Sequence, residues 1–206
     1  MNIFIIIATV IVSISAFQNR TLFHKLKFNA YYIKENGEWY RLFTGGFVHA
    51  DWMHLGFNMF ALWMFGKFVE PFFQDLLQGD KILGSLAYVA FYVAAIPMSS
   101  LFSYEKHKND QWYNAVGASG AVSAVLFSFI VQAPFSELMI FPIPIALPSI
   151  VFGALYLVYS WYMSRRGQDN IGHDAHFFGA IFGVLVTLIC RPQLGLDLID
   201  QIASKF

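Results

Sequence analysis

The sequence predicts an all-α membrane protein: one domain of six transmembrane helices with an interfacial segment between the first two. Of its 206 residues, 57% are hydrophobic and only 13% are charged, whereas soluble domains average about 25% charged residues. Windows with few or no charged side chains recur along the chain, and most are long enough for a helix to cross about 30 Å of hydrocarbon. Aromatic and basic residues alternate between the first two windows.

The expected helices follow these windows in order. The first precedes Arg20, the first charged residue, and we expect it to be retained because it lacks the basic leading region and cleavage pattern of a signal peptide. Proline interrupts helices, so Pro142, Pro144 and Pro148 mark a loop before the fifth. Within a single domain covering 1–206, the helices are expected at about 2–18, 52–73, 82–104, 113–133, 146–164 and 173–190.

Residues 18–51 form a stretch that is too long and too aromatic for a plain linker. Its mixture of aromatic and basic side chains is typical of the membrane–water interface, so we expect it to lie on the bilayer surface. A net charge of zero gives no reason to expect a nucleic-acid partner. The single cysteine, Cys190, excludes an internal disulfide and a Cys-rich metal site.

Polar groups near the starts of three expected spans identify a candidate site, because such groups are costly in a bilayer and are usually functional. These groups are His49, His54 and Asn58; Gly117, Ala118, Ser119 and Gly120; and His173, Asp174 and His176. Spans two, four and six cross in the same direction, so their starts face one side of the membrane. If these spans begin near residues 50, 115 and 172, the side chains of His54, Ser119 and His176 lie about 6 Å in and meet at one depth.

These residue types favour acyl transfer. A serine hydroxyl becomes a good nucleophile when an imidazole takes its proton, which makes Ser119 and His176 a candidate pair. His54 and Asn58 are four residues apart and share a helix face, so both can donate hydrogen bonds to a developing oxyanion. Gly117 and Gly120 allow close backbone approach beside the serine.

Each feature also has a structural interpretation. Gly-Ala-Ser-Gly is common where small residues pack helices together, an intramembrane histidine is often a hydrogen-bonded interior group, and Asn58 could join two helices. His49 and His173 are interpreted as structural, and Gly179 and Gly183 as a small-residue pair that packs the sixth helix.

Other chemistries fit less well. The His-Glu-x-x-His pattern of zinc proteases is missing. A metal cluster of four histidines has no accompanying carboxylate pattern, so no metal and no cofactor are expected. The serine motif lacks the glycine spacing of the α/β-hydrolase elbow.

The chain resembles the rhomboid family over nearly its whole length. The matching motifs are His49-x4-His54-x3-Asn58, Gly117-Ala118-Ser119-Gly120 and Ala175-His176-x2-Gly179-x3-Gly183. Glu38-Trp39-Tyr40-Arg41 is similar to the family's Trp-Arg element, which makes Arg41 a structural residue near the site. Glu70 matches an acidic residue at the inner end of the second helix.

This resemblance implies an intramembrane serine endopeptidase with a Ser119–His176 dyad and no third acid. Its oxyanion site would comprise His54, Asn58 and the backbone N–H of Ser119. The substrates would be single-span membrane proteins, cut within or near their transmembrane segment at a small residue. The chain would be a multi-pass protein of a bacterial plasma (inner) membrane, with its site open to the outer face above a loop at about 164–172. Nothing in the sequence indicates an oligomeric state.

Two features depart from the family pattern. Many members carry, four positions after the serine, an aromatic residue that stacks on the catalytic histidine. This chain has Ser123 there, so a hydrogen bond from Ser123 or Asp174 is the expected substitute. Lysines and arginines are also more numerous on the expected outer side than on the inner side, and the positive-inside rule would favour the opposite orientation.

Two other functions fit the sequence less well. A catalytically silent relative that binds and escorts membrane proteins would usually have lost the serine or the histidine, and both are present. A small transporter or channel would need a polar path across the bilayer, but the polar residues cluster at one end of the expected spans.

Overall fold

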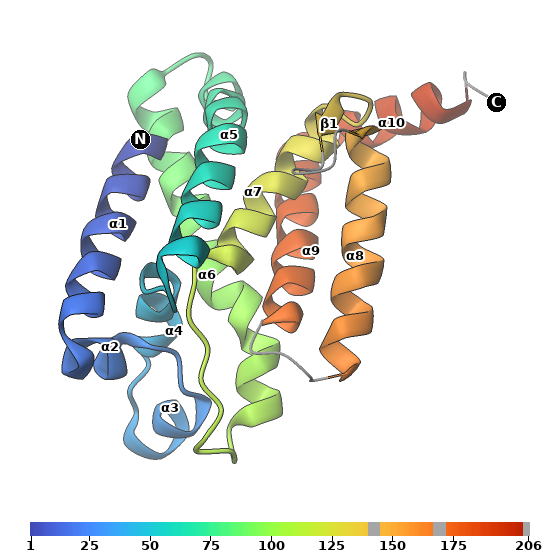
Figure 1. Cartoon of the computed structure of the whole chain (residues 1–206). Helices are drawn as coiled ribbons and strands as arrows, with labels where there is room; N and C mark the ends of the chain where they lie inside the picture. The colour runs from blue at the N-terminus through green and yellow to red at the C-terminus, as the bar shows by residue number, and fades with distance from the viewer. Residues whose placement is uncertain (140–144, 167–171, 204–206) are drawn as a thin grey trace.

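A computed structural model describes residues 1–139, 145–166 and 172–203 (Figure 1). The main bundle consists of α1 (Asn2–Gln18), α5 (Trp52–Leu76), α6 (Lys81–His107), α7 (Ser119–Gln132), α8 (Ser149–Arg166) and α9 (His173–Cys190). The connection from α1 to α5 contains α2 (Arg20–Leu26), α3 (Ala30–Asn36), α4 (Arg41–Thr44) and the 3-10 turn η1 (Gly45–Phe47). A further helix, α10 (Gln193–Ala203), follows α9.

The architecture is that of an all-α membrane protein. Of the described helices, α6 and α9 are each long and apolar enough to cross a membrane, and α1 and α7 are shorter apolar helices. Figure 1 shows that α5, α7 and α9 run in the same direction, each beginning toward the end of the bundle where α2–α4 lie. The starts of these three helices therefore share one side of the molecule.

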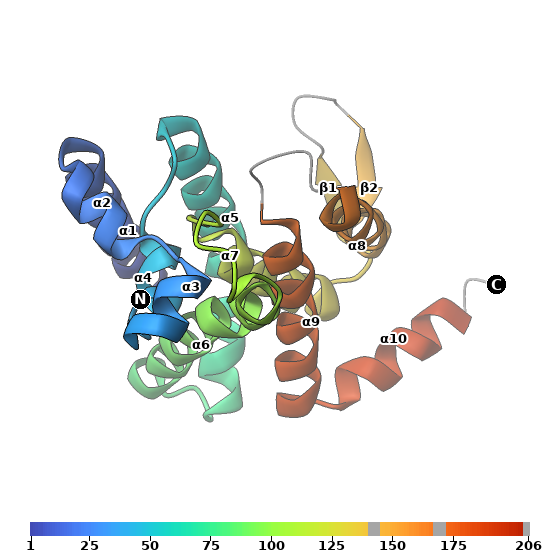
Figure 2. The ribbon, with the colours of Figure 1, turned by 90° about the horizontal axis from the view of Figure 1, so that it is seen from below.

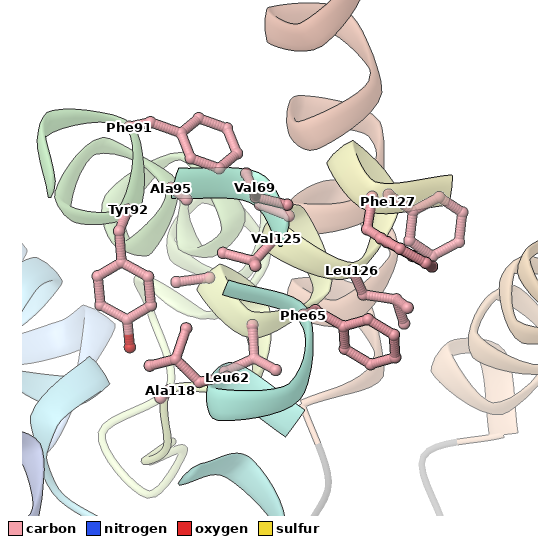
Figure 3. Close-up of a cluster of buried hydrophobic side chains, with 14 of the residues drawn as sticks. Leu62, Phe65, Val69, Phe91, Tyr92, Ala95, Ala118, Val125, Leu126 and Phe127 are labelled. Carbon is pink, nitrogen blue, oxygen red and sulfur yellow. The ribbon is translucent and has the colours of Figure 1, made fainter. Parts of the chain in front are cut away.

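The helix α7 is the centre of the packing. Its residues 120–131 are all buried, and Figure 2 shows α7 among α5, α6 and α9, with α8 and α10 farther out. Figure 3 shows the core around it, where Phe65 and Val69 of α5 lie near Leu126 and Val125 of α7, and Tyr92 and Ala95 of α6 lie on the other side of the cluster. Side chains that point inward from several helices thus hold α7 from all sides.

The expected fourth helix begins at Ser119 rather than near residue 113, so Ser119 is its first residue and not one turn in. The preceding residues are extended because the α1–α5 connection binds their backbone. Phe28 and Ala115 exchange two backbone hydrogen bonds of 3.0 and 3.1 Å, and the Gly117 N–H donates to Gly45 O at 3.0 Å. Gly117 has a φ of +117°, which is outside the helical region.

A short hairpin precedes α8, where the sequence predicted only a loop and a helix from about residue 146. The strands β1 (Glu137–Met139) and β2 (Ala146–Pro148) pair antiparallel, with Leu138 opposite Leu147. The helix starts only at Ser149 because the residue before a proline is disfavoured in the α conformation, which keeps Leu147 extended. Pro142 and Pro144 lie outside the described residues, as does most of the expected loop at 164–172.

The bounds of α1 and α9 coincide with the expected 2–18 and 173–190, while α5 and α6 extend about one turn beyond their expected ends at residues 73 and 104. The expected second and third helices ended where the hydrophobic windows end. A helix can continue beyond such a window when its polar side chains lie at the surface of the bundle.

Arg41 organises the α2–α4 segment. It is buried, and its Nη1 donates to the carbonyls of His24 at 2.8 Å and Lys27 at 2.9 Å. Its Nε pairs with Glu38, and its guanidinium lies 5.3 Å from the centre of the Tyr32 ring. A buried guanidinium with several acceptors holds separate chain segments together, so Arg41 fixes the shape of this segment.

At the opposite end, a polar cluster joins α1, α5 and α6. The Asn2 side chain donates to Leu62 O at 3.0 Å and accepts from the Tyr88 hydroxyl at 2.8 Å. Glu70 accepts from the Asn2 N–H at 2.9 Å and from Ser85 Oγ at 2.5 Å. Hydrogen bonding of buried polar groups offsets their desolvation, so Glu70 ties the three helices together.

The backbones of α7 and α9 are in direct contact. A Cβ atom at Gly179 would overlap Gly120 O, and a Cβ atom at Gly183 would overlap Ala124 O. Small residues at such positions allow helices in membranes to approach closely. The Gly179–Gly183 pair therefore sets the distance between the two helices.

Substituting Gly183→Ala should destabilise the protein by about 1–3 kcal/mol, because the added methyl group overpacks the α7 contact. The matched control is Gly56→Ala on α5, where a Cβ atom meets nothing within 4 Å. Thermal unfolding in detergent micelles, followed by tryptophan fluorescence, measures both. Equal midpoints for the two variants would contradict the packing role of Gly183.

Candidate active site

A cavity of about 790 Å³ lies beside the start of α7. It is lined by His54 and Asn58 of α5, by Ser119 of α7 and by His176 of α9. Ser119 and His176 are both half-buried. The side chains of interest near the starts of α5, α7 and α9 thus border one space.

Ser119 occupies the first position of α7. The first i→i−4 hydrogen bond of this helix joins the Val122 N–H to Ala118 O at 2.9 Å, so the N–H groups of Ser119 and Gly120 precede the helical ladder. These groups lie at the positive end of the helix dipole. The backbone beside the Ser119 hydroxyl is therefore suited to stabilise a negative charge.

His49 holds the residue just before Ser119. Its Nε2 accepts from the Ala118 N–H at 3.3 Å, and its Nδ1 lies 2.9 Å from Ser13 Oγ. The Ser13 hydroxyl donates to Phe47 O at 2.8 Å. Because that hydroxyl has a single proton, it accepts from His49 Nδ1–H. His49 is therefore a neutral imidazole with its proton on Nδ1, which joins α1 to the start of α7.

Burial, and to a smaller extent the neighbouring His54, lowers the pKa of His49 to about 3, while Asp51 acts in the opposite direction. The His49 side chain is fully buried. A protonated imidazole would lose its acceptor site for the Ala118 N–H. The site is therefore built around the uncharged form of His49.

His54 lies on the other side of the nucleophile segment. Its backbone N–H is capped by Asp51 Oδ1 at 2.8 Å. A Cβ atom at Gly117 would lie 2.7 Å from His54 Nε2, so the imidazole rests directly on the glycine backbone. Gly117 thus leaves room for His54 close to Ser119.

Asn58 is buried and lies one turn along α5 from His54. Its Nδ2 donates to His54 O at 3.0 Å. An amide nitrogen carries two protons, so this bond uses one donor and leaves the second for a group in the cavity. The hydrogen bond lies within α5, whereas the stapling interpretation of Asn58 required a bond to another helix.

Gly120 and Gly179 form a close contact between the two helices that carry Ser119 and His176. Gly120 directly follows Ser119, and Gly179 lies about one turn after His176. Since a Cβ atom at Gly179 would overlap Gly120 O, the backbones that carry the two side chains are in direct contact beside them. Arg41 does not line the cavity, because it is enclosed in the α2–α4 segment.

Ser123 and Asp174 have clear partners. Ser123 Oγ donates to Ser119 O at 2.8 Å and lies 2.6 Å from the Tyr156 hydroxyl. Asp174 pairs with Lys106 Nζ at 2.8 Å. An aromatic ring does face the imidazole of His176, but it comes from Tyr156 of α8, at a centroid distance of 6.1 Å and an interplanar angle of 26°.

Sequence reasoning did not identify Tyr156. No local pattern indicates it, because Tyr156 lies ten residues before the end of α8 whereas His176 lies three residues after the start of α9. The neighbouring contact between α8 and α9 joins Tyr159 to the buried His173, whose rings are 5.6 Å apart. In the described part of the chain, no group of three or more histidine, cysteine or acidic side chains is placed to hold a metal ion.

Comparison with known proteins identifies the family. A family model described as the Rhomboid domain matches residues 36–193. The rhomboid protease GluP of Bacillus subtilis is 31% identical over 158 residues, which cover 74% of this chain and 28% of that protein. The mitochondrial rhomboid protein 1 of Saccharomyces cerevisiae is 27% identical over 156 residues (68% and 38%). The human mitochondrial presenilin-associated rhomboid-like protein is 29% identical over 144 residues (67% and 34%). The matches thus span about a third of these three relatives.

The stability of the fold should fall as the pH drops from about 6.5 toward about 3, because the unfolded chain protonates His49 in this window and the folded chain does not. Below the unfolded pKa the unfolded state binds more protons, which lowers the free energy of unfolding. Thermal midpoints in micelles at a series of pH values measure this slope. His49→Gln should flatten it, and parallel slopes for wild type and variant would contradict this role of His49.

Proposed function

We propose that this chain, which belongs to the rhomboid family, is an intramembrane serine protease with Ser119 as nucleophile and His176 as general base. The observation that carries the proposal is that these two side chains line one cavity from helices whose backbones touch beside them. A serine and an imidazole held in this way supply the two groups that acyl transfer needs. The family also includes named proteases, of which GluP is one.

In this mechanism Ser119 Oγ attacks the carbonyl carbon of the scissile peptide while His176 takes the hydroxyl proton. The tetrahedral intermediate collapses, and His176 gives that proton to the leaving amine nitrogen. A water molecule then attacks the acyl-enzyme, passing its proton to His176, and the acid product leaves as the proton returns to Ser119. The dyad operates without a third acid.

The oxyanion would be stabilised by donors from two helices. The Ser119 N–H lies at the start of α7, and His54 and Asn58 line the same cavity from α5. Donors that are fixed before the reaction stabilise developing charge more than mobile water does. The contact of His54 with Gly117 and the hydrogen bond from Asn58 to His54 O support such fixed positions.

The substrates would be single-span membrane proteins, cut within or near their transmembrane segment. Met53 and Phe57 line the cavity and are 70% and 58% exposed, so the cavity borders the outer surface of the bundle along α5. In a bilayer that surface faces lipid. An extended substrate segment can therefore approach Ser119 sideways from the membrane.

The topology would consist of six crossings by α1 and α5–α9, with α2–α4 in the interface and the site toward the outer face of a bacterial plasma membrane. The excess of basic residues on this side would oppose that orientation under the positive-inside rule. Arg41, one of these residues, is buried and paired with Glu38. It is therefore not a free loop charge of the kind that the rule counts.

Ser119→Ala and His176→Ala should each lower the cleavage of a reconstituted single-span substrate by on the order of 10⁴-fold or more, because either change removes the dyad. Ser100→Ala is the matched control, since it removes another hydroxyl from the cavity wall that donates only to Ile96 O. Gel analysis of the products, with thermal unfolding as a check on folding, measures the effect. Cleavage by either dyad variant at the wild-type rate would falsify the assignment.

A wild-type protein that binds such substrates without cleaving them would instead favour the escort function of a catalytically silent relative. The control in that experiment is a rhomboid protease that cleaves the same substrate under the same conditions. Binding is measured by co-purification from micelles.

Asn58→Ala should reduce kcat with little change in KM, by up to the 10²–10³-fold that loss of one oxyanion donor typically causes. The effect should be smaller than that of the dyad variants, because the other donors remain. Steady-state kinetics with the reconstituted substrate separates the two constants. Unchanged kcat would remove Asn58 from the oxyanion site.

The orientation can be tested with cysteine labelling. Lys108→Cys, at the end of α6, should react with a membrane-impermeant maleimide in intact cells. The native Cys190 is exposed and lies at the opposite end of the bundle, so it should react only after permeabilisation and serves as the internal control. The reverse pattern would show that the site faces the cytoplasm.

A further inference from the structure

One side chain of α8 faces His176 of the proposed dyad and is linked to Ser119 through Ser123. The ring of Tyr156 faces the imidazole of His176, with centroids 6.1 Å apart and planes at 26°. Its hydroxyl lies 2.6 Å from Ser123 Oγ, and Ser123 Oγ donates to Ser119 O at 2.8 Å. Tyr156 also lines the cavity.

The direction of these hydrogen bonds follows from proton counting. A serine hydroxyl has one proton, and that of Ser123 is donated to Ser119 O. The Tyr156 hydroxyl is therefore the donor to Ser123 Oγ. The result is a chain of two hydrogen bonds from Tyr156 through Ser123 to the carbonyl of the nucleophile's own residue.

The ring of Tyr156 is also held from the sides. Phe127 of α7 lies at a centroid distance of 5.7 Å and Phe152 of α8 at 6.2 Å. A tyrosine fixed by its hydroxyl and by ring contacts has few accessible rotamers. Its flat face is thus presented to His176 in one orientation.

We propose that Tyr156 is the positioning residue that orients the imidazole of His176 toward Ser119, with Ser123 as its anchor on α7. This inference rests on the proposed dyad. An imidazole that acts as a base for a neighbouring hydroxyl must keep its ring plane and tilt, and a parallel aromatic face restricts both. Because Tyr156 belongs to α8, the alignment of the dyad depends on the docking of α8 against α7 and α9.

The outer position of α8 makes this dependence significant. Leu155 and Val158, on either side of Tyr156 in sequence, are 56% and 65% exposed, so α8 is held mainly along one face. A small displacement of α8 would remove the ring from His176 while leaving the α7–α9 contact intact. Tyr156 thus couples an outer helix to the catalytic geometry.

The test measures the rate at which a fluorophosphonate probe labels Ser119 in the full chain in micelles. This reaction needs an aligned dyad but not the entry of a transmembrane substrate. Tyr156→Leu should slow labelling by about 10-fold or more, because a misoriented His176 imidazole takes the Ser119 proton less efficiently. Tyr156→Phe, which keeps the ring, should stay within about 3-fold of wild type.

The matched control is Tyr159→Leu, which removes the next aromatic contact between α8 and α9, that with His173. It should leave the labelling rate unchanged. Thermal midpoints show whether each variant is folded, and a partly destabilised Tyr156→Leu is measured below its midpoint. Labelling of Tyr156→Leu at the wild-type rate would overturn the inference, as would an equal loss in Tyr159→Leu.

The same experiment separates this inference from the proposed function. Labelling of the wild type that is lost in Ser119→Ala supports the nucleophile independently of Tyr156. If the wild type is not labelled at all, the proposed dyad fails and the role of Tyr156 fails with it. If the wild type is labelled and Tyr156→Leu labels as fast, only the role of Tyr156 is overturned.

Discussion

The contact between the backbones of α7 and α9 is the constraint on which the rest of the site depends. Lipid chains are as apolar as the helices, so burial alone does not drive helices together in a membrane, and close packing has to contribute instead. Gly179 and Gly183 provide it by fitting against Gly120 O and Ala124 O. Because Ser119 precedes Gly120 directly and His176 lies about one turn before Gly179, the contact that stabilises the bundle also constrains the spacing of Ser119 and His176.

A second constraint acts on the chain just before α7. Phe28, Gly45 and His49 bind the backbone at Ala115, Gly117 and Ala118 in succession. These hydrogen bonds satisfy backbone N–H and C=O groups of an extended segment, which would otherwise be costly to bury. They also decide where the helix begins, and therefore that Ser119 stands at its positive end. The α2–α4 segment, which is folded around Arg41, thus supports the site. Its charged side chains do not line the cavity.

Much of this arrangement could be predicted from the sequence. The expected helices follow windows with few charged residues, and α1 and α9 span 2–18 and 173–190 in the structure; parity predicted that the starts of α5, α7 and α9 share one side. The predicted start of α7 was wrong because the residues that bind the backbone just before it are 69 or more positions away in the sequence, and no local pattern reports contacts at that separation. The hairpin before α8 was missed because an apolar run preceding Pro148 suits a strand or a helix equally. The roles of Ser119, His176, His54 and Asn58 remain predictions, now with one cavity in which they meet.

The pairing of Ser123 with Tyr156 has a consequence for how related chains are classified. A bulky residue at one of these positions and a small one at the other fill the same volume, so the two positions are expected to covary among homologues. A search that demands an aromatic residue at a fixed distance after the serine would discard this chain as degenerate. A criterion based on position in space would retain it, because the ring reaches the imidazole from a different helix.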